Sequence, residues 1–171
     1  SLGYNFAEVE AKLNKIDEDK FDLLFEIERG QKTKISKIDF IGNNNVRSNR
    51  LKDVIASEEN KFWKVISRNT VLSADLINLD KRLLKNYYKN RGFYNIEIVD
   101  NFVELNKENS SFNLTYNINA GNKFLIKNLS LTLPEDYVKD DFDKINKIFE
   151  KNINENYSLR IINDILDEIE S

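Results

Sequence analysis

The chain lacks several residue types on which most enzyme and metal sites depend. Its 171 residues include no cysteine, no histidine and no methionine, one proline and five glycines. Without cysteine there can be neither a disulfide nor thiolate chemistry. Without histidine, general acid–base work would fall to carboxylates, lysine or tyrosine. The absence of methionine, and hence of a start residue, leads us to expect a segment of a longer protein.

A strong charge of one sign and a long apolar run are also missing. The chain has 26 lysine and arginine residues and 29 acidic residues, which gives a net charge of −3. The protein therefore has no broad positive electrostatic potential that would attract nucleic acid or anionic lipid. No apolar run approaches the roughly 20 residues of a membrane-spanning helix, and no signal peptide is visible. The acidic pairs at 58–59 and 140–141 lack the alternating spacing of a calcium loop. We therefore expect a protein that is not an enzyme, with no metal and no cofactor.

What the chain does contain is an internal repeat with a period of about ninety residues. A glycine–aromatic turn, an apolar segment and a strictly alternating segment occur twice, ending at Gly30 and again at Gly121. The alternating residues are Phe21, Leu23, Phe25 and Ile27 in the first copy, and Phe112, Leu114, Tyr116 and Ile118 in the second. Such self-similarity indicates modules in series, which usually present surfaces for binding.

Residues 31–121 predict one complete unit of β-α-α-β-β order. A strand over 35–41 ends at Gly42, and Ser48 is the predicted N-cap of a short helix. Ser73 is the predicted N-cap of a longer helix, and Gly92 ends it. Two strands, 93–105 and 111–119, complete the unit. The apolar stripe of the longer helix is predicted to be Leu76, Leu79, Leu83 and Tyr87, widened by Ile77, Leu84 and Tyr88.

The flanking segments predict incomplete units. Residues 1–30 read as the C-terminal β-hairpin of a preceding unit, and residues 122–171 as the first strand and two helices of a following one, with Pro134 opening the first helix. The junctions leave almost no linker, so the units should articulate stiffly. A hairpin without helices and helices without a hairpin complement each other. We therefore expect head-to-tail self-association of this fragment.

The module order, with "NYYKNRGF" ending the longer helix, resembles the POTRA domain family. "ISKIDFIGNNNV" is similar to the opening strand of such a domain, and "NKFWKVISRNTVLSADLINLDKRLL" to its middle. The resemblance implies an α+β chain of tandem POTRA modules, each with two helices packed on a three-stranded mixed sheet. It also implies a periplasmic segment, attached to the outer membrane, of an outer-membrane protein assembly factor. Its partners would be unfolded barrel proteins or accessory lipoproteins, bound by β-augmentation.

The strand at 93–105 has apolar residues at positions on both faces. Alternation predicts that Tyr94, Ile96, Ile98 and Phe102 point inward. The candidate partner-binding residues of this edge strand are Val99, Asn101, Val103 and Leu105. The outward apolar residues among them indicate either a β-bulge that re-aims the side chains or a partner on the outside.

A second candidate contact lies in the loop between the two helices of the complete unit. Phe62 and Trp63 either cover the helix ends or pack against an adjacent domain or a partner. Two other functions remain open: a POTRA arm of another secretion or autotransporter-assembly barrel, and a KH-like RNA-binding module. The longer helix is basic, with Lys81, Arg82, Lys85, Lys89 and Arg91, but the Gly-x-x-Gly loop of KH modules is missing.

Overall fold

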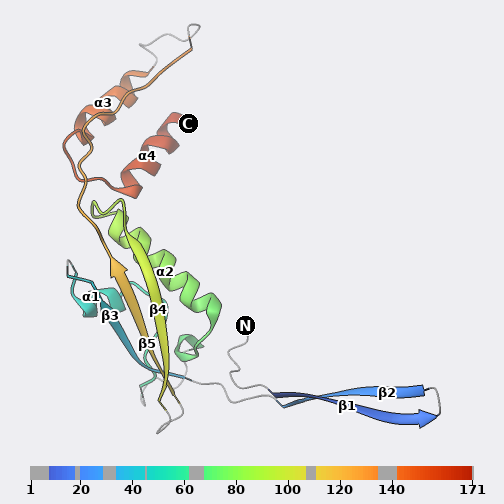
Figure 1. Cartoon of the computed structure of the whole chain (residues 1–171). Coiled ribbons are helices and arrows are strands. Elements are labelled where there is room, and N and C mark those ends of the chain that lie inside the picture. The colour runs from blue at the N-terminus through green and yellow to red at the C-terminus, as the bar shows by residue number, and fades with distance from the viewer. Residues whose placement is uncertain are drawn as a thin grey trace.

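The computed structural model describes residues 8–17, 20–28, 34–44, 46–61, 68–106, 111–134 and 142–170. Figure 1 shows three parts along the chain: an N-terminal hairpin, a central unit of strands and helices, and a C-terminal pair of helices. None of the helices in these ranges is long and apolar enough to cross a membrane.

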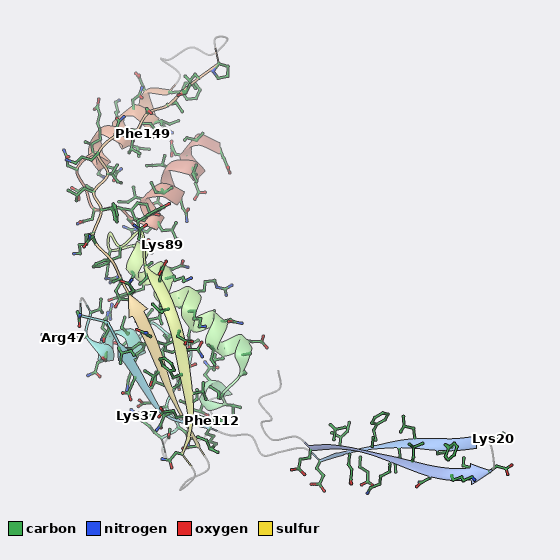
Figure 2. The ribbon with its side chains drawn as sticks, in the orientation of Figure 1. Lys20, Lys37, Arg47, Lys89, Phe112 and Phe149 are labelled. Carbon is green, nitrogen blue, oxygen red and sulfur yellow. The ribbon has the colours of Figure 1, made fainter. Side chains whose placement is uncertain are left out.

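The N-terminal hairpin has one apolar and one acidic face. Strand β1 (Glu8–Asp17) pairs antiparallel with β2 (Lys20–Glu28), which places Leu13 opposite Leu23. Residues directly opposite each other share a face. The apolar face carries Val9, Ala11, Leu13, Phe21, Leu23, Phe25 and Ile27, and the other face carries Glu8, Glu10, Lys12, Leu24, Glu26 and Glu28. Every described side chain of the hairpin is exposed, and Figure 2 shows them standing on both sides of the two strands.

The central unit is built on a three-stranded mixed sheet. Its strands are β3 (Ile35–Ile41), β4 (Glu97–Asn106) and β5 (Ser111–Asn119), in the order β3-β5-β4. Strand β5 is parallel to β3 and antiparallel to β4. Helix α1 (Ser48–Lys52), the 3-10 helix η1 (Arg68–Thr70) and helix α2 (Ala74–Lys89) lie between β3 and β4 in sequence. The predicted α+β class and the mixed sheet are confirmed.

One face of the sheet packs against the helices and forms the core. The predicted inward face of β5 is confirmed, since Leu114 and Tyr116 are fully buried. Helices α1 and α2 contribute Leu51, Leu84 and Tyr88 to the same cluster. The buried core residues are Ile35, Ile38, Phe40, Leu51, Ile55, Leu72, Leu84, Tyr88, Phe93, Ile96, Phe112, Leu114, Tyr116, Ile118 and Ala120.

Helix α2 is rotated within the apolar stripe that the sequence predicted. Leu84 and Tyr88, which were predicted to widen the stripe, are buried together with Asp80, whereas Leu76, Leu79 and Leu83, which were predicted as its centre, are only half-buried. The reason is the Asp80 carboxyl group, which accepts hydrogen bonds from the Ala56 N–H (2.7 Å), the Ser57 N–H (3.0 Å) and the Tyr116 hydroxyl (2.6 Å). Burial, and then the neighbouring Asp80, raise the pKa of Tyr116.

The predicted helix caps have mixed outcomes. Ser73 is the N-cap of α2, and its hydroxyl accepts a hydrogen bond from the Leu76 N–H, as predicted. The prediction for Ser48 was wrong: Arg47 is the N-cap of α1 and makes no side-chain cap bond. The Ser48 hydroxyl instead accepts from the Asn43 amide, which holds the turn that precedes the helix.

The outer edge of β3 is covered by the chain that follows α1. The Ile38 N–H donates to Glu59 Oε1 (3.0 Å) and the Asn60 N–H donates to the Ile35 carbonyl (2.7 Å). Lys52 forms an ion pair with Glu59 across a cleft of about 320 Å³. Burial raises the pKa of Glu59, but the bonds from Lys52 and Ile38 outweigh it, so that the pKa lies below its usual value of 4.5. The Glu59 side chain therefore accepts a hydrogen bond from a β3 backbone N–H that an added strand would otherwise bind.

The C-terminal part has two helices and a small core of its own. Helices α3 (Asp143–Asn152) and α4 (Leu159–Glu170) bury Ile145, Phe149 and Ile165 between them. The strand predicted near the start of 122–171 is not formed: the described residues 122–134 make one isolated bridge, between Leu125 and Asn156. No neighbouring strand within the described ranges is placed to complete a ladder. Pro134 lies outside any helix, and the predicted helical residues 135–141 fall outside the described residues.

The end of β3 allows a stability prediction, because Gly42 has no room for a side chain. Its φ is +70°, and an added Cβ would lie 2.1 Å from the Ile118 carbonyl oxygen. Gly121 has a similar φ of +66°, but an added Cβ there would meet nothing closer than 3.8 Å. We expect Gly121→Ala to cost about 1–2 kcal/mol from backbone strain alone, and Gly42→Ala to cost clearly more. Chemical denaturation of both variants measures the difference, and equal losses would contradict it.

The Glu59 contacts predict an acid-dependent loss of stability. Because its folded pKa is depressed, Glu59 stabilises the fold above its unfolded pKa, and this contribution is lost as the pH falls through the folded pKa. The pair is partly exposed, so we expect the loss to be below about 1 kcal/mol. Thermal unfolding of the natural chain and of Glu59→Gln between neutral and acid pH measures it. The substitution should reduce the pH dependence, and identical pH profiles would show that Glu59 contributes nothing.

Candidate functional site

Strand β4 contains a β-bulge that changes which way its side chains point. Ile98 lies opposite Ile118, but Asp100 lies opposite Asn117, so β4 has one extra residue, Val99, at this point. Beyond the bulge, Val103 lies opposite the buried Leu114 and therefore on the helix side of the sheet. By the same register Asn101 and Leu105 are on the helix side, opposite Tyr116 and Phe112.

This register corrects the inward and outward faces predicted for β4. Simple alternation assigned Val103 and Leu105 to the outer face and Phe102 to the core. The structure places Phe102 opposite Thr115, on the outer face. Of the two explanations offered for the apolar pattern, the β-bulge is the one that the structure contains. Its one extra residue exchanges the two faces of the strand for every residue that follows.

The apolar residues of β4 are nevertheless accessible on both faces. Val103 and Leu105 are 38% and 41% exposed on the helix side, and Phe102 is 45% exposed on the outer side. Val99 at the bulge is 58% exposed. All four predicted edge residues thus lie on one strand, together with Phe102, which the prediction had placed in the core. Phe62 and Trp63 lie outside the described residues.

The edge of β4 offers backbone groups that the edge of β3 does not. Among the strands that the structure describes, β4 pairs with β5 alone, and Figure 1 shows it at the border of the sheet. Within β4, the Asn101 N–H donates a local hydrogen bond to the carboxylate of its neighbour Asp100 (2.7 Å). A ten-residue edge strand of this kind presents N–H and C=O groups to an incoming strand.

The two faces of β4 differ in charge. Glu97, Asp100 and Glu104 share the outer face, and the strand carries no lysine or arginine. The helix side carries Val103 and Leu105. A strand that paired with this edge would therefore lie beside apolar side chains on one face and acidic side chains on the other.

Two residues that shape the site could not be found by periodicity. Glu59, which covers the β3 edge, lies 21 residues from its partner Ile38, in a loop with no regular pattern. Phe102 was assigned to the core because alternation was counted through Val99 without the extra residue. The run of two apolar residues at 98–99 was the local signal of the bulge.

The chain is similar to a known domain family, to a curated protein and to solved structures. Residues 33–121 match the sequence profile of the family "POTRA: Surface antigen variable number repeat". The chain is 20% identical over 117 residues to "Outer membrane protein assembly factor BamA" of Neisseria meningitidis serogroup B, a match that covers 68% of this chain and 15% of that protein.

Among solved structures, POTRA domains 3–5 of Haemophilus influenzae BamA superpose with a TM-score of 0.63 at 20% identity. That match covers 80% of this chain and 52% of the other, so the fold is shared. Haemophilus ducreyi BamA lacking POTRA domains 1–3 matches at 24% identity with a TM-score of 0.44, over 68% of this chain and 19% of that one. The chain thus spans a small part of the curated relative and about half of the first solved structure. Since the family profile covers the whole central unit, with its mixed sheet and its two helices, the chain belongs to the POTRA family.

Proposed function

We propose that the free edge of β4 binds an extended strand of an unfolded outer-membrane protein by β-augmentation. The observation that carries this proposal is a ten-residue strand that is paired on one side only and exposes apolar side chains on both faces. Main-chain hydrogen bonds would supply affinity without reading sequence, which suits a surface that accepts many clients. The similarity to an outer membrane protein assembly factor supports a role in the assembly of outer-membrane proteins. In this proposal the chain acts as part of a periplasmic arm.

The chemistry of β4 favours a client strand that alternates in polarity. Strands of membrane barrels place apolar and polar residues on opposite faces. Paired with β4, the apolar face of such a strand would lie beside Val103 and Leu105, and its polar face beside Asp100 and Glu104. Phe102 would contact the polar face through its ring. A basic residue in the client would be favoured on that side, and an acidic residue would be disfavoured.

The RNA-binding alternative has less support. Stacking on bases needs open aromatic rings, but Tyr88 is fully buried in the core. The Tyr87 ring is covered by the Arg91 guanidinium, 3.5 Å from its centroid. The basic residues of α2 are thus left without an aromatic platform. An arm of another secretion barrel would use the same edge and would differ in its clients.

The client proposal predicts that charge on the β4 edge weakens binding. The probe is a labelled peptide with the alternating apolar and polar pattern of a barrel strand. We expect Leu105→Glu to reduce the affinity for this peptide about fivefold, which is the size of one lost cross-strand contact. The matched control is Ile41→Glu, because Ile41 is similarly exposed (46%) but lies on β3, the opposite edge strand, which the loop after α1 bonds at Ile35 and Ile38. Fluorescence anisotropy measures the affinity, and thermal unfolding checks the fold.

Equal effects of the two substitutions would contradict the proposal. A large loss of thermal stability in Leu105→Glu alone would show that this side chain belongs to the core. If Leu105→Glu spares the peptide but abolishes capture of an accessory lipoprotein, the edge serves the lipoprotein instead.

We also propose that the chain self-associates head to tail through the apolar face of its hairpin, where Val9, Leu13, Leu23, Phe25 and Ile27 are all exposed. Leu23 and Leu24 provide a matched pair, since they are adjacent and both exposed but lie on opposite faces of the hairpin. We expect concentration-dependent association that Leu23→Glu abolishes and Leu24→Glu leaves in place. Sedimentation velocity over a range of concentrations measures it. A monomer at every concentration in the natural chain would remove the proposal.

A further inference from the structure

The turn that ends α2 is bonded to the start of α4 through a side chain. Asn90, the C-cap residue of α2, places its side-chain oxygen 2.8 Å from the Arg160 backbone nitrogen and 3.3 Å from the Ser158 hydroxyl oxygen. Arg160 is the second residue of α4, and its N–H has no partner within its own helix. The Asn90 oxygen therefore takes the place that the N-cap side chain of a helix normally fills. Here the cap comes from a different structural unit, about seventy residues earlier in the chain.

Backbone hydrogen bonds continue this connection across three segments. The Phe124 N–H donates to the Gly92 carbonyl (2.8 Å), and the Phe124 carbonyl accepts from the Tyr157 N–H (2.8 Å). The Ile126 N–H then donates to the Glu155 carbonyl (2.9 Å). The turn after α2, the segment at 124–126 and the turn before α4 are thus held side by side. Figure 2 labels Lys89 at the end of α2, where these segments meet.

An aromatic cluster surrounds the same junction. The Tyr94 ring, from the central unit, meets Phe124 and Tyr157 edge to face, with centroids 6.2 Å and 5.1 Å apart. Such contacts depend on the mutual angle of the rings. The cluster is therefore sensitive to rotation of one unit against the other.

We propose that Asn90 is a positioning residue that holds the central unit and the α3–α4 unit in one orientation, together with the cluster of Tyr94, Phe124 and Tyr157. Because the cap of α4 comes from the other unit, the capping hydrogen bond is available only while the two units keep this orientation. Stability of the first turn of α4 and the angle between the units are thereby coupled. The β4 edge then keeps a fixed direction relative to the next unit, whether or not a client is bound.

The test measures a distance between the two units in the whole chain. The chain has no cysteine, so spin labels attach only where cysteines are introduced. Arg82→Cys on α2 and Lys147→Cys on α3 replace exposed residues, one in each unit. Double electron–electron resonance gives the distribution of distances between them. We expect a single narrow distribution in this background and a broader one when Asn90→Ala is added.

Two further variants separate the cap from nonspecific effects. Asn86→Ala makes the same change one turn earlier, at an exposed position, and should leave the distribution narrow. Asn90→Asp keeps an acceptor oxygen for the Arg160 N–H, and an acidic group is favourable at the N-terminus of α4 but unfavourable at the C-terminus of α2. Because the capping bond is kept, this variant should also leave the distribution narrow. Amide hydrogen exchange at Arg160 should be about fivefold faster in Asn90→Ala, the change expected from losing an N-cap.

Each outcome decides the proposal. A distribution in Asn90→Ala as narrow as in Asn86→Ala would overturn it, even if exchange at Arg160 is faster, because the cap would then be local to α4. Circular dichroism would report whether Asn90→Ala unfolds α4. In that case the distance measurement is repeated with Tyr94→Ala in place of Asn90→Ala. Tyr94 is 54% exposed and is not part of the core cluster. Broadening in that variant with α4 intact would support the proposal, and an unchanged distribution would overturn it.

Discussion

The buried carboxyl group of Asp80 fixes the arrangement of the central unit. Its two oxygens accept hydrogen bonds from two other segments, the backbone after α1 and the Tyr116 hydroxyl on β5, and so hold both against α2. A buried polar group without partners is costly, so the helix can approach the sheet closely only with this face turned inward. That rotation places Leu84 and Tyr88 in the core. The relative positions of both helices and the sheet therefore follow from one side chain.

Sequence periodicity found the elements whose pattern is purely apolar and unbroken. Strand β5 was predicted with its correct face because every second residue from Phe112 to Ile118 is apolar and is buried. The rotation of α2 within its apolar stripe was not predicted, because Asp80 is held in the core by hydrogen bonds from Ala56, Ser57 and Tyr116, which periodicity does not show. The phase of β4 was lost at Val99, where a single inserted residue exchanges the two faces. In both cases the missing information was a contact with another part of the chain.

The two edge strands of the sheet differ in how their outer backbone groups are covered, and this difference defines the candidate site. At β3, a loop supplies Glu59 and Asn60 to backbone groups that would otherwise be open. At β4, the described residues show a bulge and acidic residues on one face. Charges and bulges are the usual means by which edge strands avoid indiscriminate pairing. An edge with these features and accessible apolar residues is suited to selective pairing, whereas the β3 edge is already bonded by the loop at Ile35 and Ile38.

The bulge at Val99 also limits how long any added strand can be. A regular strand paired along β4 stays in phase from Asn106 back to Asp100, and beyond that the extra residue breaks its alternation. At about 3.3 Å per residue, the continuous ladder is about 23 Å long. Few hydrogen bonds must then break for the strand to leave, which favours a short residence time. A bound segment would be released soon after it is captured, and successive segments of one polypeptide could occupy the same edge in turn.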